Sequence, residues 1–166
     1  MKYLIALLAV AGIIVSSQAL HVHYMDPGTA PPCAVSEQFD CGAVNHSKYS
    51  VFPPQSDDEF DPNTGQFQAN KPHIPVATVG IIGYAAILIC ALFGQRRLVL
   101  EFARIGFFCA AFLSYLEAYV IHKWCIYCLK SQGIITVILL VSIADLLLRR
   151  RRRAHSMASV LAEHVD

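Results

Sequence analysis

The sequence is poor in charged residues, which make up only 15% of its 166 positions, and its formal net charge is +1. A nearly neutral chain gives no global electrostatic signal for nucleic acid binding. No Gly-rich phosphate loop, serine triad or nucleic-acid motif is apparent either. Hydrophobic residues make up 55% of the chain, and the mean hydropathy is +0.48. This composition is too apolar for an ordinary soluble domain.

Four apolar blocks of near-bilayer length account for the composition: 3–20, 74–94, 102–121 and 131–148. A helix of about 20 mostly apolar residues crosses about 30 Å of hydrocarbon, so each block is a predicted membrane span. In the last block Asp145 lies four residues before Arg149, where the two can pair near the membrane surface. The sequence predicts an all-α membrane protein, with a four-helix transmembrane bundle over 1–148 and a basic cytoplasmic tail over 149–166.

The basic residues indicate how the spans are oriented. Lys2, Arg96, Arg97 and the arginine run 149–153 all fall on one side of the predicted spans. Segment 21–73 carries seven acidic residues and two lysines, so we expect it on the other side. Because cytoplasmic loops are enriched in Lys and Arg, both termini are predicted to be cytoplasmic and 21–73 is predicted to be an exoplasmic loop.

The first block also has features of a cleavable signal peptide. Lys2 precedes an apolar stretch that ends near the small-residue triplet Ser17-Gln18-Ala19. Cleavage would leave three spans in the same orientation. We expect the block to be retained as the first span.

Four of the six cysteines are predicted to face the exoplasmic side, where disulfides persist: Cys33, Cys41, Cys125 and Cys128. The other two, Cys90 and Cys109, lie inside predicted spans. Free cysteine behaves as a small hydrophobic residue, so these two are predicted to pack in the core.

The motif Trp124-Cys125-Ile126-Tyr127-Cys128 places a C-x-x-C pair where the chain enters the last span. Two intervening residues let the sulfurs meet across one helical turn, and a helix N-terminus favours a thiolate. This geometry suits a reversible redox pair. Alternatively, the two cysteines form half of a zinc site or a structural disulfide. Zinc would need further ligands, and the sequence has no second C-x-x-C and no H-x-x-x-H motif, so no metal is expected.

Cys33 and Cys41 lie eight residues apart in a Pro-rich polar run, which predicts a loop with a short helix over 36–39. A structural disulfide is one interpretation of this pair. Two exoplasmic cysteine pairs on one small bundle also suit an electron relay by thiol exchange. In such a relay electrons enter at the loop and leave from the bundle.

The order of these motifs resembles the vitamin K epoxide reductase family in its bacterial form, over roughly 1–148. The matching elements are Cys33, Cys41, the stretch 45–52, Ile74-Pro75-Val76-Ala77 with Gly80 and Gly83-Tyr84, and the C-x-x-C motif. The resemblance implies a four-helix bundle that holds a quinone of ubiquinone or menaquinone type near the C-x-x-C. It also implies a multi-pass protein of the bacterial inner membrane whose active cysteines face the periplasm.

The resemblance assigns a role to each exoplasmic cysteine. Cys128 is the sulfur that acts on the quinone, and Cys125 forms a disulfide with Cys128 and is attacked by the loop. Cys33 and Cys41 carry electrons from a thioredoxin-fold partner, with Cys41 as the residue that meets Cys125. Many bacterial members have a fused thioredoxin-like domain, but only 154–166 follows the arginine run here, so the partner is expected to be a separate protein.

Two further positions correspond to the family's quinone pocket. Ser47 matches the serine that follows the second loop cysteine. Gln132 stands where the vertebrate enzyme has a tyrosine, so vertebrate-like ligand and anticoagulant binding is not expected. Segment 53–73 is longer and more polar than the family's usual link, and it is predicted to be a surface excursion.

Glu117, eight residues before Cys125, is a carboxyl group inside a predicted span. Such groups are functional candidates, and quinone reduction consumes two protons, so Glu117 is a candidate proton carrier. The alternatives are a structural carboxyl bonded to Tyr84, Tyr115 or a neighbouring backbone group, or one that faces lipid headgroups.

Taken together, the residues and the resemblance predict a membrane thiol-disulfide oxidoreductase that oxidises a dithiol partner, reduces a quinone and supports disulfide bond formation. One alternative is reduction of vitamin K epoxide by the same four cysteines. Another is a non-catalytic four-span protein whose exoplasmic loops are held by two structural disulfides.

Overall fold

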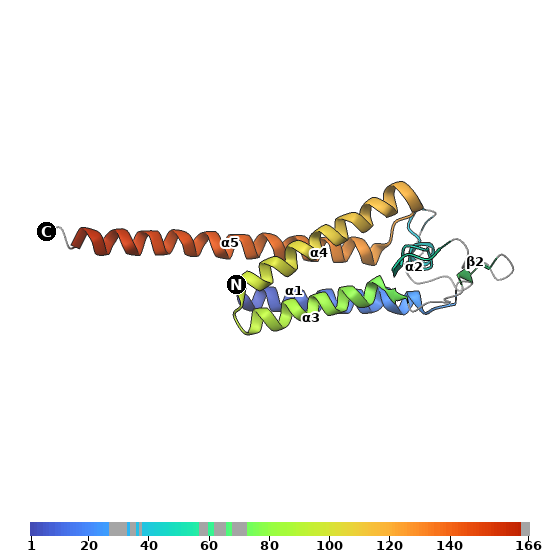
Figure 1. Cartoon of the computed structure of the whole chain (residues 1–166), viewed down its shortest axis with the longest axis horizontal. Coiled ribbons are helices and arrows are strands. Elements are labelled where there is room, and N and C mark those ends of the chain that lie inside the picture. Colours follow the sequence, from blue (N-terminus) through green and yellow to red (C-terminus); the bar gives the residue numbers. More distant parts are fainter. Residues whose placement is uncertain are drawn as a thin grey trace.

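A computed structural model describes residues 1–26, 33, 36, 38–56, 60–61, 66–67 and 73–163. Among these residues, the helices of at least 17 residues are α1 (Lys2–His23), α3 (Val76–Leu92), α4 (Arg96–Leu116) and α5 (Ile126–Glu163). The helices α1 and α4 each contact both α3 and α5, which makes a four-helix bundle (Figure 1). The short helix α2 (Cys41–Asn45) lies at one end of the bundle, and the π-helical segment η2 (Glu117–Ile121) continues α4.

Three stretches of helix among the described residues are long and apolar enough to cross a membrane: Lys2–His23, Arg96–Ile121 and Ile126–Arg152. They support the prediction of a multi-pass membrane protein. The remaining long helix, α3, is apolar but has 17 residues. At 1.5 Å per residue it is about 25 Å long, slightly less than the hydrocarbon thickness.

The bundle core consists mainly of aliphatic side chains: Ile5, Ala9, Tyr84, Ile87, Ala91, Val99, Ala103, Ile135 and Ile138. The helices α1 and α3 approach closely at Gly12, where an added Cβ would lie 2.6 Å from Cζ of Tyr84. Cys90 packs against this core, as predicted. Cys109 does not, because it lies on an exposed face of α4, so the prediction of core packing is wrong there.

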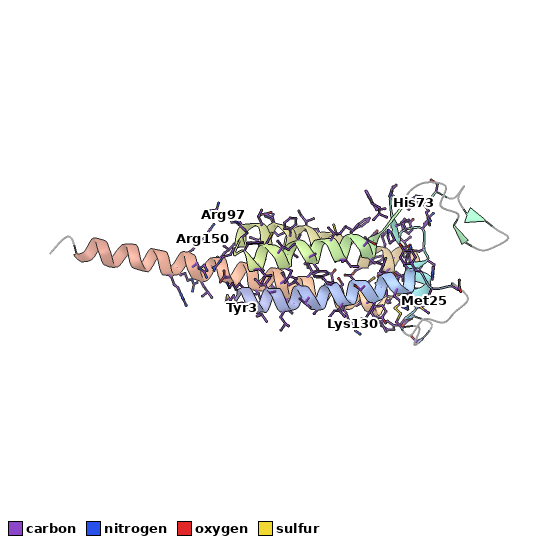
Figure 2. The ribbon with its side chains drawn as sticks, turned by 90° about the horizontal axis from the view of Figure 1, so that it is seen from below. Tyr3, Met25, His73, Arg97, Lys130 and Arg150 are labelled. Atoms are coloured by element: carbon purple, nitrogen blue, oxygen red, sulfur yellow. A yellow bond between two sulfur atoms is a disulfide. The ribbon has the colours of Figure 1, made fainter. Side chains whose placement is uncertain are left out.

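Arginines of α4 and α5 mark one end of the bundle. Asp145 binds Arg149 at 3.2 Å, as predicted, and it also binds Arg96 at 2.8 Å. The second bond ties the turn between α3 and α4 to α5. Figure 2 shows Tyr3, Arg97 and Arg150 at this end, and Met25, His73 and Lys130 at the opposite end. The helix α5 continues through the arginine run to Glu163.

Short strands mark the excursion between α2 and α3. Strand β1 (Val51–Phe52) pairs antiparallel with β4 (Ile74–Pro75), with Val51 opposite Pro75, and this pair closes the base of the excursion. Strands β2 (Phe60–Asp61) and β3 (Gln66–Phe67) pair antiparallel within it. The acidic cluster 57–59 lies outside the described residues.

Candidate redox site

The loop cysteines form a disulfide. The Cα atoms of Cys33 and Cys41 are 5.8 Å apart, within the usual range for such a bond. Cys41 begins helix α2, and the side chain of Asp40 caps this helix by accepting a hydrogen bond from the backbone N–H of Ala43 at 3.1 Å. The prediction of a short helix over 36–39 is wrong, because Phe39 forms a β-bridge and the helical turn begins only after the Asp40 cap.

Backbone hydrogen bonds hold this loop against the C-x-x-C motif. Phe39 and Trp124 form a parallel β-bridge. The N–H of Asp40 donates to the carbonyl of Trp124 at 3.1 Å, and the N–H of Trp124 donates to the carbonyl of Gln38 at 2.8 Å. The residue before Cys41 is therefore fixed to the residue before Cys125, which brings the two cysteine pairs to one place.

All four predicted redox cysteines meet in one cluster. Cys33, Cys41 and Cys125 belong to the same buried group, and Cys128 packs against it. Cys41 and Cys125 are fully buried. Cys125 and Cys128 are free thiols, while the loop pair is bonded. The structure therefore has an oxidised pair and a reduced pair in one cluster.

Asn45 also contacts this cluster through hydrogen bonds that the sequence pattern does not predict. Its side-chain amide donates to the carbonyl of Cys41 at 2.8 Å and to the sulfur of Cys125 at 3.7 Å. Nothing in the linear pattern signals this contact, since Asn45 and Cys125 are 80 residues apart. The contact depends on how α2 docks against the C-x-x-C motif.

Glu117 lies beneath the C-x-x-C motif. The π-helical segment η2 starts at Glu117 and ends at His122, which adopts a left-handed conformation with φ of 56°. The chain then reverses, so the backbone N–H of Cys125 donates to Oε2 of Glu117 at 3.0 Å. The carboxyl group also interacts with the thiol of Cys128, and its Oε1 atom is buried without another partner among the described residues.

Two predicted alternatives for Glu117 can be compared with this geometry. Its bond is to a neighbouring backbone group rather than to a tyrosine. The hydroxyl of Tyr84 donates instead to the carbonyl of Ser131 at 2.9 Å and lies equally close to the Ser131 hydroxyl. Glu117 is only 2% exposed, which argues against a carboxyl facing lipid headgroups.

The surroundings of Cys125 favour its thiolate. The side chain of Cys128 hydrogen-bonds to Cys125 and lowers the pKa of the Cys125 thiol, and the backbone amides of Cys128 and Tyr127 act in the same direction. Burial and the negative charge of Glu117 oppose this effect, but the net pKa is lowered. A lowered pKa makes a cysteine a better leaving group in thiol exchange.

An apolar cavity of about 250 Å³ adjoins the cysteine cluster, near the lower end of the range for small-molecule sites. The lining also includes these polar residues: Ser16, Asn45, Ser47, Tyr49, Ser50, Tyr84, Glu117, Tyr127, Cys128 and Ser131. Ser47, predicted at a quinone pocket, is among them. Gln132 does not line the cavity, and the neighbouring Ser131 does.

The histidines near the loop serve as hydrogen-bond donors to backbone. His23 donates to the carbonyl of Asn45 at 2.6 Å. The ring of His46 lies between two carbonyls, with Nδ1 2.9 Å from that of Gly42 and Nε2 3.0 Å from that of Met25, and it donates to one of them through its N–H. Among the residues that the structure describes, no group of three or more His, Cys, Asp or Glu side chains could hold a metal ion.

Residues 3–143 match the vitamin K epoxide reductase family. A search of curated proteins finds no match. The matched range includes both cysteine pairs, Glu117 and every long helix up to the middle of α5. This family consists of membrane oxidoreductases that are linked to quinones and work with thioredoxin-like partners. The chain belongs to the vitamin K epoxide reductase family.

Proposed function

We propose that the protein is a membrane thiol-disulfide oxidoreductase that oxidises a thioredoxin-fold dithiol protein and reduces a quinone, and so supports disulfide bond formation. One observation carries the proposal. The Cys33–Cys41 disulfide and the free thiols of Cys125 and Cys128 share a cluster whose inner member, Cys128, lines an apolar cavity. Electrons can thus pass by thiol exchange from the loop to a pocket for an apolar ligand.

We propose that electrons pass from the partner to the C-x-x-C pair in three steps of thiol exchange. A partner dithiol reduces the Cys33–Cys41 disulfide and leaves as a disulfide. The thiolate of Cys41 attacks Cys125 in the Cys125–Cys128 disulfide and releases Cys128 as a thiolate. Cys33 then attacks Cys41 and releases Cys125, which leaves the loop oxidised and the C-x-x-C pair reduced. The structure has this arrangement of bonds.

The cavity fits a quinone ring. It is mainly apolar, as a lipid-soluble ring requires, and Cys128 lines it together with a few polar residues. We propose that Ser47 and the bonded pair Tyr84 and Ser131 contact the ring oxygens, with Ser131 supplying the contact predicted at Gln132. A bound quinone supplies the acceptor for two electrons and two protons. The chain's part is to orient the ring beside Cys128 and exclude water.

Glu117 is proposed as the proton carrier for this reaction. Its carboxyl group lies between the backbone of Cys125 and the thiol of Cys128, and it lines the cavity. A proton that leaves the Cys128 thiol therefore has an acceptor that also faces the ligand. The unpartnered Oε1 atom is available for this transfer.

We further propose that α3 completes a four-span bundle with the cysteines on the exoplasmic side, which is the periplasm in a bacterial cell, and both termini in the cytoplasm. The position of α3 between α1 and α4 supports the fourth span. The arginines at the opposite end from the cysteine loop support the orientation.

Quinone-dependent oxidation of a reduced thioredoxin-fold protein tests this function. The full chain would be purified with native lipid and assayed with ubiquinone, menaquinone and vitamin K epoxide. Cys128→Ala should abolish turnover with every electron donor. Cys33→Ala should retain turnover with dithiothreitol, a small thiol that does not need the loop relay, and lose it with the protein donor. Cys90→Ala, a core cysteine outside the site, is the control and should retain both activities.

The outcomes separate the alternatives. Turnover with vitamin K epoxide alone would identify an epoxide reductase. Disulfides that resist mild reductant, together with no quinone-dependent oxidation, would identify a non-catalytic protein with structural bridges and contradict the proposal.

A further inference from the structure

Asn45 joins the two cysteine pairs through one amide nitrogen. Its Nδ2 atom lies 2.8 Å from the carbonyl oxygen of Cys41 and 3.7 Å from the sulfur of Cys125. A carbonyl oxygen only accepts hydrogen bonds, so the amide must present its NH₂ group to this side. One hydrogen of that group is then directed at the carbonyl oxygen of Cys41 and the other at the sulfur of Cys125. The side chain is 7% exposed, which shields these bonds from water.

Two features fix the position of Asn45. It is the last residue of α2, whose first turn is capped by Asp40. Its own carbonyl accepts a 2.6 Å hydrogen bond from the ring of His23 in the last turn of α1. The amide therefore cannot follow Cys125 freely, and it offers a donor at a fixed place.

The groups packed around Cys125 explain why its sulfur needs a hydrogen-bond donor. The titratable groups packed around it are Glu117 from η2, Cys128 from α5 and, beyond Asn45, His23 from α1. The Glu117 carboxylate and burial both disfavour a thiolate on Cys125. Asn45 supplies a neutral N–H donor to the sulfur that counters these unfavourable contributions. Hydrogen bonds to an ionised acceptor are stronger than bonds between neutral groups.

We propose that Asn45 is a positioning residue for thiol exchange, which holds Cys41 and Cys125 in register and donates to the Cys125 thiolate as it leaves. The inference rests on the exchange sequence proposed above. When Cys33 attacks Cys41 of the Cys41–Cys125 bond, a Cys33–Cys41 bond forms and the Cys41–Cys125 bond breaks. The electron pair moves to the sulfur of Cys125, where the Asn45 amide donates its hydrogen bond. In the reverse direction the same donor lowers the nucleophilicity of Cys125 but raises its thiolate fraction.

The test measures the pH dependence of Cys125 alkylation in the full chain, reduced by dithiothreitol, without quinone or partner. Peptide mass spectrometry reports the rate at Cys125 alone. The rate at neutral pH is divided by the rate at the alkaline plateau, so a change in the accessibility of Cys125 cancels. In Asn45→Ala this ratio should fall about three- to tenfold, because the thiolate loses a hydrogen bond. In Asn45→Asp, which keeps the size but replaces the donor with an acceptor, it should fall further.

Asp40→Ala is the matched control. It removes the cap of α2, and so loosens the same helix, but leaves the amide of Asn45 in place. A merely structural role for Asn45 predicts that Asp40→Ala and Asn45→Ala change the ratio alike. The positioning role predicts that Asp40→Ala leaves the ratio unchanged or raises it, because an acidic group has been removed.

The outcomes also distinguish this inference from the proposed function. An unchanged ratio in Asn45→Ala, in protein that still reduces quinone, would overturn the role of Asn45 and leave the function intact. A lowered ratio in protein that shows no quinone-dependent turnover would support the positioning role while the proposed function fails.

Discussion

The carboxylate of Glu117 accepts a 3.0 Å hydrogen bond from the backbone N–H of Cys125. This bond links the end of the third long helix to the start of the C-x-x-C motif across the turn at His122. It satisfies a buried amide that precedes helix α5 and lies outside that helix's own hydrogen-bond ladder. The same carboxyl group interacts with Cys128, so one side chain both shapes the turn and lies beside the thiol that is proposed to give up a proton.

Replacement of Glu117 by Gln separates these two roles. A glutamine can accept the bond from Cys125 through its amide oxygen, so we expect a folded protein with an intact loop disulfide. It cannot carry the proton, and quinone reduction should fall at least tenfold, since a positioned acid or base commonly contributes 10²–10⁴-fold. Quinol formation with dithiothreitol as the donor measures this change without involving the loop.

The control is Glu101→Gln. Glu101 is an exposed carboxylate of α4 that pairs with Arg104 at 3.2 Å. Its loss removes one negative charge from the same helix and should leave turnover unchanged. Full turnover in Glu117→Gln would show that the carboxyl group is structural only.

Gly12 and Tyr84 provide a packing test. A Cβ at position 12 would clash with the ring of Tyr84, so Gly12→Ala must push α1 from α3 or displace the ring from Ser131. We expect a loss of about 1–3 kcal/mol in stability. Gly83→Ala is the matched control, because nothing lies within 4 Å of its added Cβ. It should be neutral or slightly stabilising in thermal unfolding, since alanine favours helix. Equal melting temperatures for the two variants would contradict the packing described for Gly12.

Much of this architecture is predictable from the sequence. The apolar blocks predict α1 and α3 to within three residues, because lipid-facing and core-facing positions are both apolar. The helix α4 begins before its block, and α5 continues beyond its block through the arginine run to Glu163. The C-x-x-C spacing predicts a pair at the start of a helix, and the structure places Cys125 directly before α5 and Cys128 in its first turn. The spacing of Asp145 and Arg149 predicts their ion pair, which depends only on helical periodicity.

Contacts between distant segments are what the sequence cannot supply. The pairing of Phe39 with Trp124 depends on backbone groups, which carry no residue signature. The bond from Asn45 to Cys125 follows from that docking. The π-helical turn at Glu117 is equally invisible, because its residues continue the apolar pattern of α4. At Gln132, the position matched by family correspondence is not among the residues that line the cavity, while the neighbouring Ser131 is.

The orientation of the bundle predicts where labels can reach. Gln95 lies in the turn between α3 and α4, next to Arg96, which is bound to Asp145 at the basic end. A cysteine placed at Gln95 should be protected from a membrane-impermeant reagent in intact cells. After reduction, the loop cysteines Cys33 and Cys41 should react with the same reagent. Labelling of position 95 from outside would reverse the assignment of sides.

The lowered pKa of Cys125 predicts its reactivity profile. Its thiolate should be present at pH values where an ordinary cysteine, with a pKa of about 8.5, is still protonated, so its alkylation should accelerate at lower pH than that of a model thiol. Cys128→Ala removes the principal hydrogen bond that lowers this pKa and should move the profile to higher pH. Glu117→Gln removes a negative charge that raises the pKa of Cys125, so it should move the alkylation profile to lower pH. Shifts in the opposite directions would refute this account of the site.

The final prediction is a trapped intermediate. In Cys128→Ala the thiolate of Cys125 has no C-x-x-C partner, and it is packed in one buried cluster with the Cys33–Cys41 disulfide. It should attack Cys41, because Asn45 bonds both Cys41 and Cys125, and release Cys33 as a free thiol. Non-reducing peptide mapping should therefore recover a Cys41–Cys125 bridge as the main new species. Recovery of a Cys33–Cys125 bridge would exchange the roles of the loop cysteines. An intact Cys33–Cys41 bridge with Cys125 free would indicate that the loop disulfide is structural.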